Sequence, residues 1–187
     1  MKLFCRMVVV VGCPSGGTSA VTGTLTKNGY YNRGHKSPYF ETSCAGANTR
    51  AQMWGFPTRK AMVHDLFKVK KYFCLYTKEA VEAGFERAVV KMAWGPLWEP
   101  EIFEGTGVDV LLVHRDIESH AASIQRRNMH KSPYWMAKIG QERILQLHAE
   151  TGWPMFTFGK AASHEDLEAA IGHPLPVRYF EPDAVRH

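Results

Sequence analysis

The most constraining feature of the chain is a run of four valines that leads into a glycine-rich turn, residues 8–19. A short, continuously apolar stretch is typical of a strand buried on both faces of a parallel sheet. Gly12 and Gly17 have the G-x-x-x-x-G spacing of a phosphate-binding loop, but Thr18 and Ser19 stand where ATP- and GTP-using loops carry Lys and then Ser or Thr. Backbone amides ahead of a helix attract anions without that lysine. The loop therefore predicts a phosphate ligand other than an ordinary triphosphate.

The rest of the chain alternates between strand and helix patterns. Apolar runs predict strands at 87–91, 108–114 and 154–158, with a strand-like pair at 30–31. Helices are expected at 18–28, 77–85, 116–128, 134–150 and 163–172, and 41–54 could also be helical. This alternation predicts an α/β protein with a three-layer P-loop-type fold. Its central, mainly parallel sheet would have about five strands flanked by helices, with ligands at the carboxyl ends of the strands.

Composition narrows the class of protein. A chain of 187 residues, 45% of them hydrophobic, predicts one domain over residues 1–187. The formal charge of +5 favours anionic ligands, but the basic residues are scattered, so no nucleic-acid partner is expected. The four cysteines form no C-x-x-C pair and have no histidines at zinc-like spacing, which predicts no metal site and a reducing compartment.

Hydropathy predicts a cytoplasmic protein with no membrane partner. The apolar stretch near the start of the chain is about five residues long, whereas the core of a secretion signal needs about 7–15. Nothing in the sequence approaches the roughly 18 consecutive apolar residues of a membrane span.

A second candidate phosphate site follows the strand at 108–114. This strand ends in His114 and Arg115, where a P-loop kinase or GTPase usually has an acidic residue that holds magnesium. A guanidinium offers paired donors that match phosphate oxygens. On the following helix, Ser123 and Arg127 fall on one face, so Arg115, Ser123 and either Arg127 or Arg126 could surround one anion. Alternatively, Arg115 pairs with a surface carboxylate.

Taken together, these motifs resemble the sulfotransferases that use 3'-phosphoadenosine 5'-phosphosulfate (PAPS), a branch of the P-loop fold, and small bacterial members in particular. The resemblance spans roughly residues 8–127. It implies that Arg115 and Ser123, which lies eight positions later, bind the 3'-phosphate, with Arg127 as a further candidate. It also implies that the 5'-phosphosulfate is bound by the loop residues Pro14, Ser15, Gly16, Gly17, Thr18 and Ser19.

Two further stretches are similar to the family. One comprises residues 28–31, the aromatic–glutamate pair at 40–41 and Asn48; the other comprises residues 89–91 and 96–98. In several members the lysine of this middle strand, here Lys91, helps to carry the sulfuryl group. Many members also have a basic residue in the loop where this chain has Ser15. The missing charge could come from Lys91 or from Lys27 on the helix after the loop.

The resemblance implies transfer of a sulfuryl group from PAPS to a hydroxyl or amine, in line and without an obligatory metal. Cytosolic members place a histidine base two residues after the strand lysine, where this chain has Ala93. Glu41 is therefore the first candidate for the base and His35 the second. A small molecule or a carbohydrate is the expected acceptor, and a peptide is also compatible. The alternatives are a catalytically silent nucleotide-binding P-loop protein and a divergent P-loop kinase.

Overall fold

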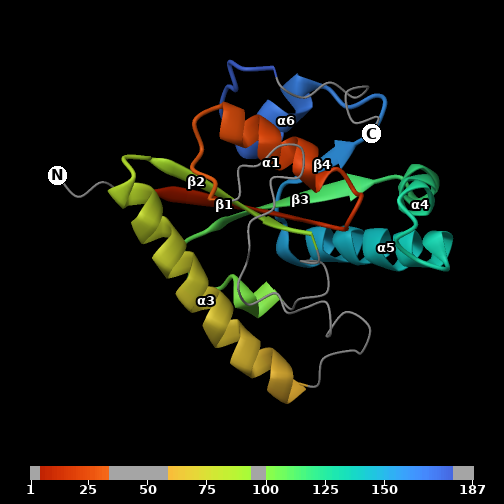
Figure 1. Cartoon of the computed structure of the whole chain (residues 1–187), viewed down its shortest axis with the longest axis horizontal. Helices are drawn as coiled ribbons and strands as arrows, with labels where there is room; N and C mark the ends of the chain where they lie inside the picture. The colour runs from red at the N-terminus through yellow and green to blue at the C-terminus, as the bar shows by residue number, and fades with distance from the viewer. Residues whose placement is uncertain (1–4, 34–58, 94–99, 179–187) are drawn as a thin grey trace.

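The computed structural model describes residues 5–33, 59–93 and 100–178, with the backbone only for residues 59–69. Its core is a parallel sheet with the strand order β2-β1-β3-β4. The strands are β1 (Arg6–Gly12), β2 (Arg87–Met92), β3 (Asp109–Arg115) and β4 (Met155–Phe158). The predicted α/β class is therefore confirmed (Figure 1).

The sheet has four strands in the part of the chain that the structure describes, one fewer than expected. The strand-like pair at 30–31 forms only an isolated bridge, between Tyr31 and Ala88 on the free edge of β2. The Tyr31 amide donates to the Arg87 carbonyl at 2.8 Å, and the Val89 amide donates to the Tyr31 carbonyl at 2.9 Å. Pairing stops after these two hydrogen bonds, so this segment holds the edge position without becoming a strand.

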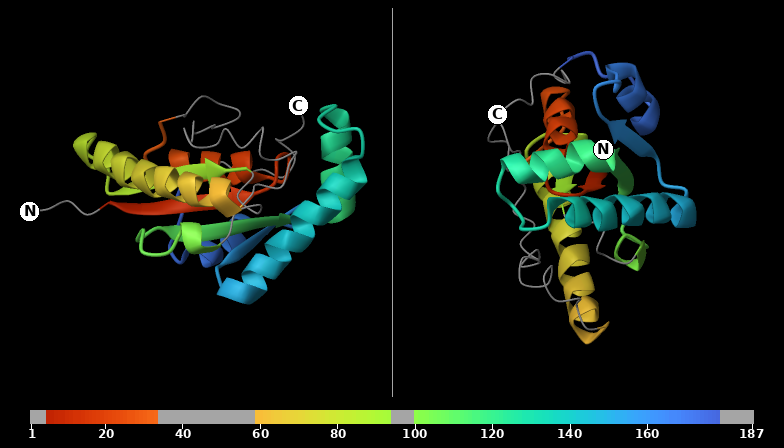
Figure 2. Two further views of the ribbon diagram at one scale, coloured as in Figure 1. Left: turned by 90° about the horizontal axis from the view of Figure 1, so that it is seen from below. Right: turned by 90° about the vertical axis from the view of Figure 1, so that its right-hand side faces the viewer.

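Helices cover both faces of the sheet, which gives three layers (Figures 1 and 2). The helices are α1 (Thr18–Lys27), α3 (Arg59–Glu82), α4 (Ile117–Arg126), α5 (Pro133–Thr151) and α6 (His164–Ile171), and a short 3-10 turn, η2, covers Pro100–Ile102. The strands place alternate side chains on opposite faces. Met7, Val9 and Val11 of β1 pack in the cluster that includes α3 and α5, while Val8 and Val10 pack in the cluster that includes α1 and α6.

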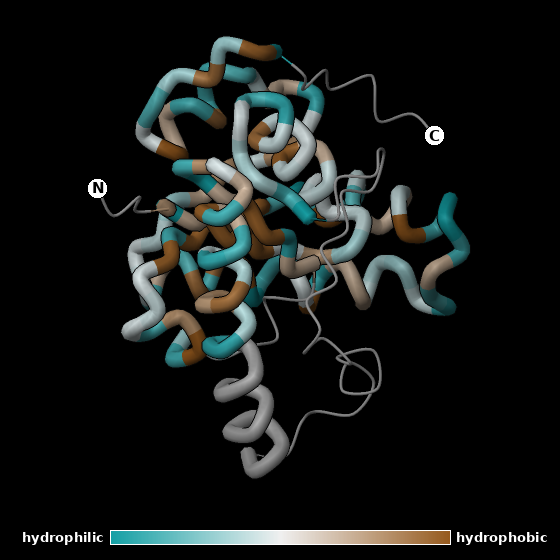
Figure 3. The backbone as a smooth tube through the Cα atoms, turned by 60° about the vertical axis from the view of Figure 1, so that its left-hand side comes forward, coloured by the Kyte–Doolittle hydropathy of each residue, from teal (hydrophilic) through white to brown (hydrophobic). Residues whose placement is uncertain are grey.

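This double burial explains why β1 is an unbroken valine run. Each fully buried valine contributes about 1.5–3 kcal/mol of hydrophobic free energy, and valines on both faces of the strand make this contribution. In Figure 3 the hydrophobic stretches of the strands gather in the middle of the molecule. None of the helices in the described ranges is long and apolar enough to span a bilayer.

Helix α3 is the main difference from the sequence prediction, which started a helix at Thr77. The observed helix begins at Arg59, so Thr77 lies well inside it. Its hydroxyl donates to the carbonyl of Phe73 at 2.9 Å, one turn earlier, instead of capping a helix start. The apolar face formed by Phe73, Tyr76 and Ala80 is buried against the sheet cluster, and this packing overrides the local cap preference of threonine.

The other helix starts agree with the sequence. Asp116 caps α4 by accepting from the Ser119 amide, and Pro133 opens α5. Ser163 and Asp166 form a reciprocal capping box on α6. Helix α4 lies beyond the carboxyl ends of β1 and β3, and this position brings it next to the glycine-rich loop (Figure 1).

Candidate functional site

The glycine-rich loop connects the carboxyl end of β1 to the amino end of α1. Its turn is closed by the Gly16 amide, which donates to the Cys13 carbonyl at 2.9 Å. Ser15 has a φ of 63° and Gly17 a φ of 99°, so both adopt the left-handed conformation. A Cβ atom at Gly17 would also collide with the ring of Phe158. Gly17 is therefore required twice, for its backbone angle and for the close approach of β4.

The loop presents a set of unpaired amides. Gly17 is the N-cap of α1 and provides no side-chain cap hydrogen bond. Within the described residues, the amides of Ser15, Gly17, Thr18 and Ser19 have no protein acceptor. Amides left open at the positive end of a helix form a cradle for an oxyanion. The geometry expected from the glycine spacing is therefore present.

Two side chains contact carbonyl groups of the loop. His120 Nε2 lies 2.7 Å from the Pro14 carbonyl oxygen, and Arg115 Nη1 donates to the Ser15 carbonyl at 2.9 Å. The carbonyl and amide of a trans peptide point in opposite directions. The contact with His120 fixes the direction of the Pro14 carbonyl, and the Ser15 amide of the same peptide therefore points away from His120.

Lys91 lies beside the loop. It is the fifth residue of β2, pairs with Val10 of β1, and is only 4% exposed. Its Nζ atom donates to Ser19 Oγ at 3.1 Å. Lys27, the alternative source of charge, is in the last turn of α1. It lies nine residues beyond Thr18, roughly 13 Å along the helix axis, so Lys91 is the better placed of the two lysines.

The end of β3 gathers positive charge. Arg115 stacks its guanidinium on Phe158, 5.2 Å from the ring centroid. Burial lowers the pKa of Arg115; Asp116 opposes that effect, and the nearby charges of Arg126 and Arg127 add to it. Arg115 Nε is buried and has no hydrogen-bond partner among the residues described.

The three residues expected to surround a second anion differ in exposure. Arg115 is half-buried against the loop, Ser123 is buried on α4, and Arg127 is exposed at the C-cap of that helix. The Arg127 amide donates to the Ser123 carbonyl at 3.3 Å, so these two residues are adjacent. One nitrogen of the Arg115 guanidinium already donates to the Ser15 carbonyl of the loop. A 3'-phosphate site at these three residues stays a prediction.

No acidic side chain ends β3. Asp116, which directly follows the strand, accepts from the Ser119 amide at 2.9 Å. The hydrogen bonds from Ser119 lower the pKa of Asp116. Across the described ranges, no group of three or more His, Cys, Asp or Glu side chains is placed to hold a metal ion. The two candidate bases, Glu41 and His35, lie outside the described residues.

Cys13, at the start of the loop, is buried and packs as a small apolar side chain. Its side chain packs closely against Gly140 of α5, where an added Cβ would collide with the sulfur. Burial raises the pKa of the Cys13 thiol to about 12. A thiol that stays protonated at neutral pH packs as a small apolar group.

Sequence reasoning missed His120 and Gln141. His120 lies on the same helical face as Ile117 and Ile124, which pack in one apolar cluster, so a polar residue within that apolar stripe was an available signal. Gln141 gave no signal, because a glutamine in a mixed-polarity helix usually faces solvent. In the structure it is fully buried.

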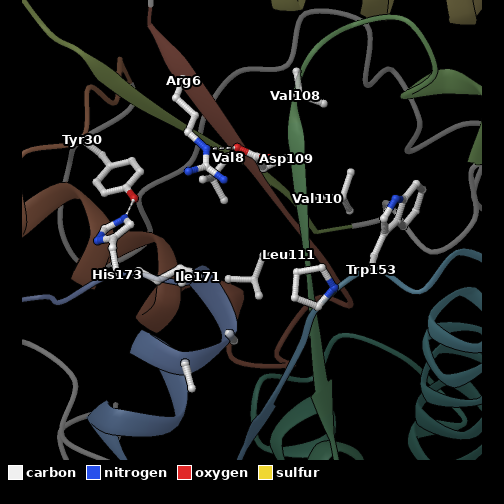
Figure 4. A pocket seen from close by; sticks show the side chains of 14 residues that line it. Arg6, Val8, Tyr30, Val108, Asp109, Val110, Leu111, Trp153, Ile171 and His173 are labelled. Carbon is white, nitrogen blue, oxygen red and sulfur yellow. Dashed lines mark hydrogen bonds and ion pairs between the residues drawn. The ribbon is translucent and has the colours of Figure 1, made fainter.

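A separate pocket of about 390 Å³ lies at the opposite, amino-terminal edge of the sheet (Figure 4). Four of its polar side chains form two pairs. Arg6 Nε contacts a carboxylate oxygen of Asp109 at 2.5 Å, and the Tyr30 hydroxyl is hydrogen-bonded to His173. None of the residues expected to bind a ligand lines this pocket.

The elements described define an α/β protein whose first strand leads into a loop with the glycine spacing of phosphate-binding loops. No protein-family model matches the chain, and no curated protein matches it. Solved structures with a similar outline include the following two. TT1252 from Thermus thermophilus is 16% identical and aligns over 90% of this chain and 95% of its own, with a TM-score of 0.49.

The second is a deoxyadenosine kinase from M. mycoides, solved with bound dATP. It is 11% identical, aligns over 89% of this chain and 98% of its own, and has a TM-score of 0.47. Similarities at this level carry no information about function.

Proposed function

We propose that the chain binds a nucleotide through a phosphate group held by the loop amides of Ser15, Gly17, Thr18 and Ser19. The observation that carries the proposal is the buried ammonium group of Lys91, 3.1 Å from Ser19 Oγ, next to amides that have no protein acceptor in the described structure. A cation and several amide donors that converge on one place are the complement of an oxyanion. Lys91 would then supply the positive charge that the loop itself lacks.

The finer proposal is that this nucleotide is PAPS and that the chain transfers its sulfuryl group. Its support is the motif resemblance together with the arginine at the end of β3, where a magnesium-binding acid would otherwise be expected. The phosphosulfate end of PAPS carries less charge than a triphosphate, so amides and one lysine can neutralise it without a metal. Lys91 would stabilise the charge on the leaving phosphate. Glu41 or His35 would accept the proton of the acceptor.

Binding is tested with 3'-phosphoadenosine 5'-phosphate in the presence of EDTA, by calorimetry and thermal shift. We expect binding without magnesium, and a loss of roughly 10- to 150-fold in affinity for Lys91→Met, because a hydrogen bond to a charged group contributes about 1.5–3 kcal/mol. Lys138→Met is the matched control, since Lys138 is an exposed lysine on α5 that pairs with Glu142. Equal affinity of Lys91→Met and the wild type would contradict the assignment of Lys91.

The choice between PAPS chemistry and the alternatives needs a separate measurement. Incubation with sulfur-labelled PAPS and a panel of hydroxyl and amine acceptors should give labelled product that disappears in Lys91→Met. Tight binding of 3'-phosphoadenosine 5'-phosphate with no transfer of labelled sulfate to any acceptor would instead support the catalytically silent nucleotide-binding protein. Magnesium-dependent ATP turnover would support the kinase.

A further inference from the structure

A chain of three hydrogen bonds connects β3 to the loop through α5 and α4. The Arg115 backbone amide donates to Gln141 Oε1 at 2.9 Å. Gln141 Nε2 lies 2.8 Å from His120 Nδ1, and His120 Nε2 lies 2.7 Å from the Pro14 carbonyl oxygen. Both side chains are almost completely buried, with exposures of 0% for Gln141 and 1% for His120.

The partners at the two ends of this chain determine the position of every hydrogen in it. A backbone amide can only donate, so Gln141 must turn its carbonyl oxygen toward Arg115 and its NH₂ group toward His120. His120 Nδ1 must then accept, and so carries no proton. The ring proton is left on Nε2, where it is donated to the Pro14 carbonyl, which can only accept. One protonation state and one tautomer of His120 satisfy all three contacts.

The charged form of His120 does not fit this arrangement. A proton on Nδ1 would face the NH₂ group of Gln141, and turning the amide over would move the same conflict to the Arg115 amide. Burial lowers the pKa of His120; the Pro14 carbonyl and Asp116 oppose that effect, and the charges of Arg115 and His114 add to it. The buried imidazole is therefore neutral at physiological pH.

We infer that neutral His120, with its proton on Nε2, positions the phosphate loop, and that Gln141 positions His120. The inference deepens the proposed function and rests on it. The Nε2 proton hydrogen-bonds to the Pro14 carbonyl and so fixes the orientation of the peptide between Pro14 and Ser15. In this orientation the Ser15 amide points toward the bound oxyanion. His120 does not touch the ligand, so its contribution is the direction of an amide donor rather than a contact of its own.

Inorganic sulfate is the probe for the test, because it stays fully ionised throughout the neutral pH range. Its affinity is measured by NMR titration of the backbone amides, against sodium chloride at matched ionic strength. His120→Leu should weaken sulfate binding by roughly tenfold or more, with loss of the Ser15 amide shift, because one donor to a charged acceptor is lost. His120→Gln keeps a donor near the Pro14 carbonyl and should bind within about threefold of the wild type. Tenfold loss in His120→Gln as well, or none in His120→Leu, would overturn the inference.

His164→Leu is the matched control. His164 is also a buried histidine on a helix, and its Nε2 atom lies 2.6 Å from the Leu175 carbonyl oxygen, away from the loop. Its replacement should leave sulfate affinity unchanged. If the wild type binds neither sulfate nor 3'-phosphoadenosine 5'-phosphate, the proposed function fails; if it binds and His120→Leu binds equally well, only the inference fails.

The proton positions are tested independently of the loss variant, in case His120→Leu does not fold. Nitrogen-15 shifts of the wild-type imidazole at pH 7 should show a proton on Nε2 and none on Nδ1, with and without sulfate. In Gln141→Glu, a carboxylate replaces the NH₂ group and should draw a second proton onto Nδ1. A wild-type proton on Nδ1, or an unchanged imidazole in Gln141→Glu, would contradict the proposed chain of donors and acceptors.

Discussion

Single side chains give the loop its shape through sterics as well as through hydrogen bonds. Gly17 has a φ of 99° and faces the ring of Phe158, whereas Gly152, the C-cap of α5, has a φ of 68° with nothing near its missing Cβ. The two glycines share a left-handed backbone but differ in the space around them. Comparing them separates backbone strain from collision.

We expect Gly17→Ala to lower the free energy of unfolding by about 1–3 kcal/mol more than Gly152→Ala. Both substitutions carry the cost of an unfavourable φ, about 1 kcal/mol, and only Gly17→Ala adds a collision with a packed aromatic ring. Urea unfolding of the two variants measures the difference. Equal losses would mean that Phe158 does not constrain the loop.

Among the helices, α4 does the most to define the site, because it carries His120 and because its N-cap, Asp116, directly follows Arg115. Its start is set by Asp116, whose carboxylate accepts from the Ser119 amide at 2.9 Å. Asp116 is also the first carboxylate after the end of β3. If the chain were a P-loop kinase, Asp116 would be the candidate magnesium ligand. The structure assigns it to the helix cap.

Two substitutions at this position distinguish a cap from a metal ligand. Asp116→Ala should cost about 0.5–2 kcal/mol of unfolding free energy, while Asp116→Asn should keep most of it, because asparagine also accepts from a helix amide. We expect Asp116→Asn to bind 3'-phosphoadenosine 5'-phosphate as the wild type does in EDTA. A magnesium-dependent loss of nucleotide binding in Asp116→Asn would point to a metal ligand instead.

For the molecule as a whole, two histidines with lowered pKa values, the half-buried His114 and the buried His120, couple stability to pH. Burial lowers the pKa of both His114 and His120 from their ordinary value of 6.5. The unfolded chain therefore binds protons that the folded chain does not, beginning near pH 6.5. The stability that these two histidines contribute by staying neutral is fully present above that pH. It is lost as the pH falls through their folded pKa values.

Acid should therefore weaken the fold before the carboxylates titrate. The urea midpoint is expected to fall between pH 7 and pH 5, and the double variant His114→Gln His120→Gln should show a smaller fall over the same range. The lowered pKa of Asp116 adds a second loss, which begins below its ordinary value of 3.8. An identical pH profile for the wild type and the double variant would exclude the histidines as its source.

Much of the fold could be predicted because its signals are local. The valine run, the apolar runs at β2 and β3 and the cap at Asp116 involve residues within a few positions of one another. Helix α3 was misjudged because the cap preference of Thr77 is also local, and buried packing of the surrounding turns overrode it. The edge segment at Tyr31 was counted as a strand because the local pattern does not say how far pairing continues.

The sequence alone was enough to indicate the glycine loop, the parallel sheet and the end of β3 as the place for a ligand. Each depends on backbone angles and burial patterns that short segments carry within themselves. The contacts that shape the loop join Ser19 to Lys91, Ser15 to Arg115 and Pro14 to His120, across separations of 72, 100 and 106 residues. They form only when strand register and helix packing bring distant segments together. The buried histidine and glutamine behind the loop therefore became visible only in the folded molecule.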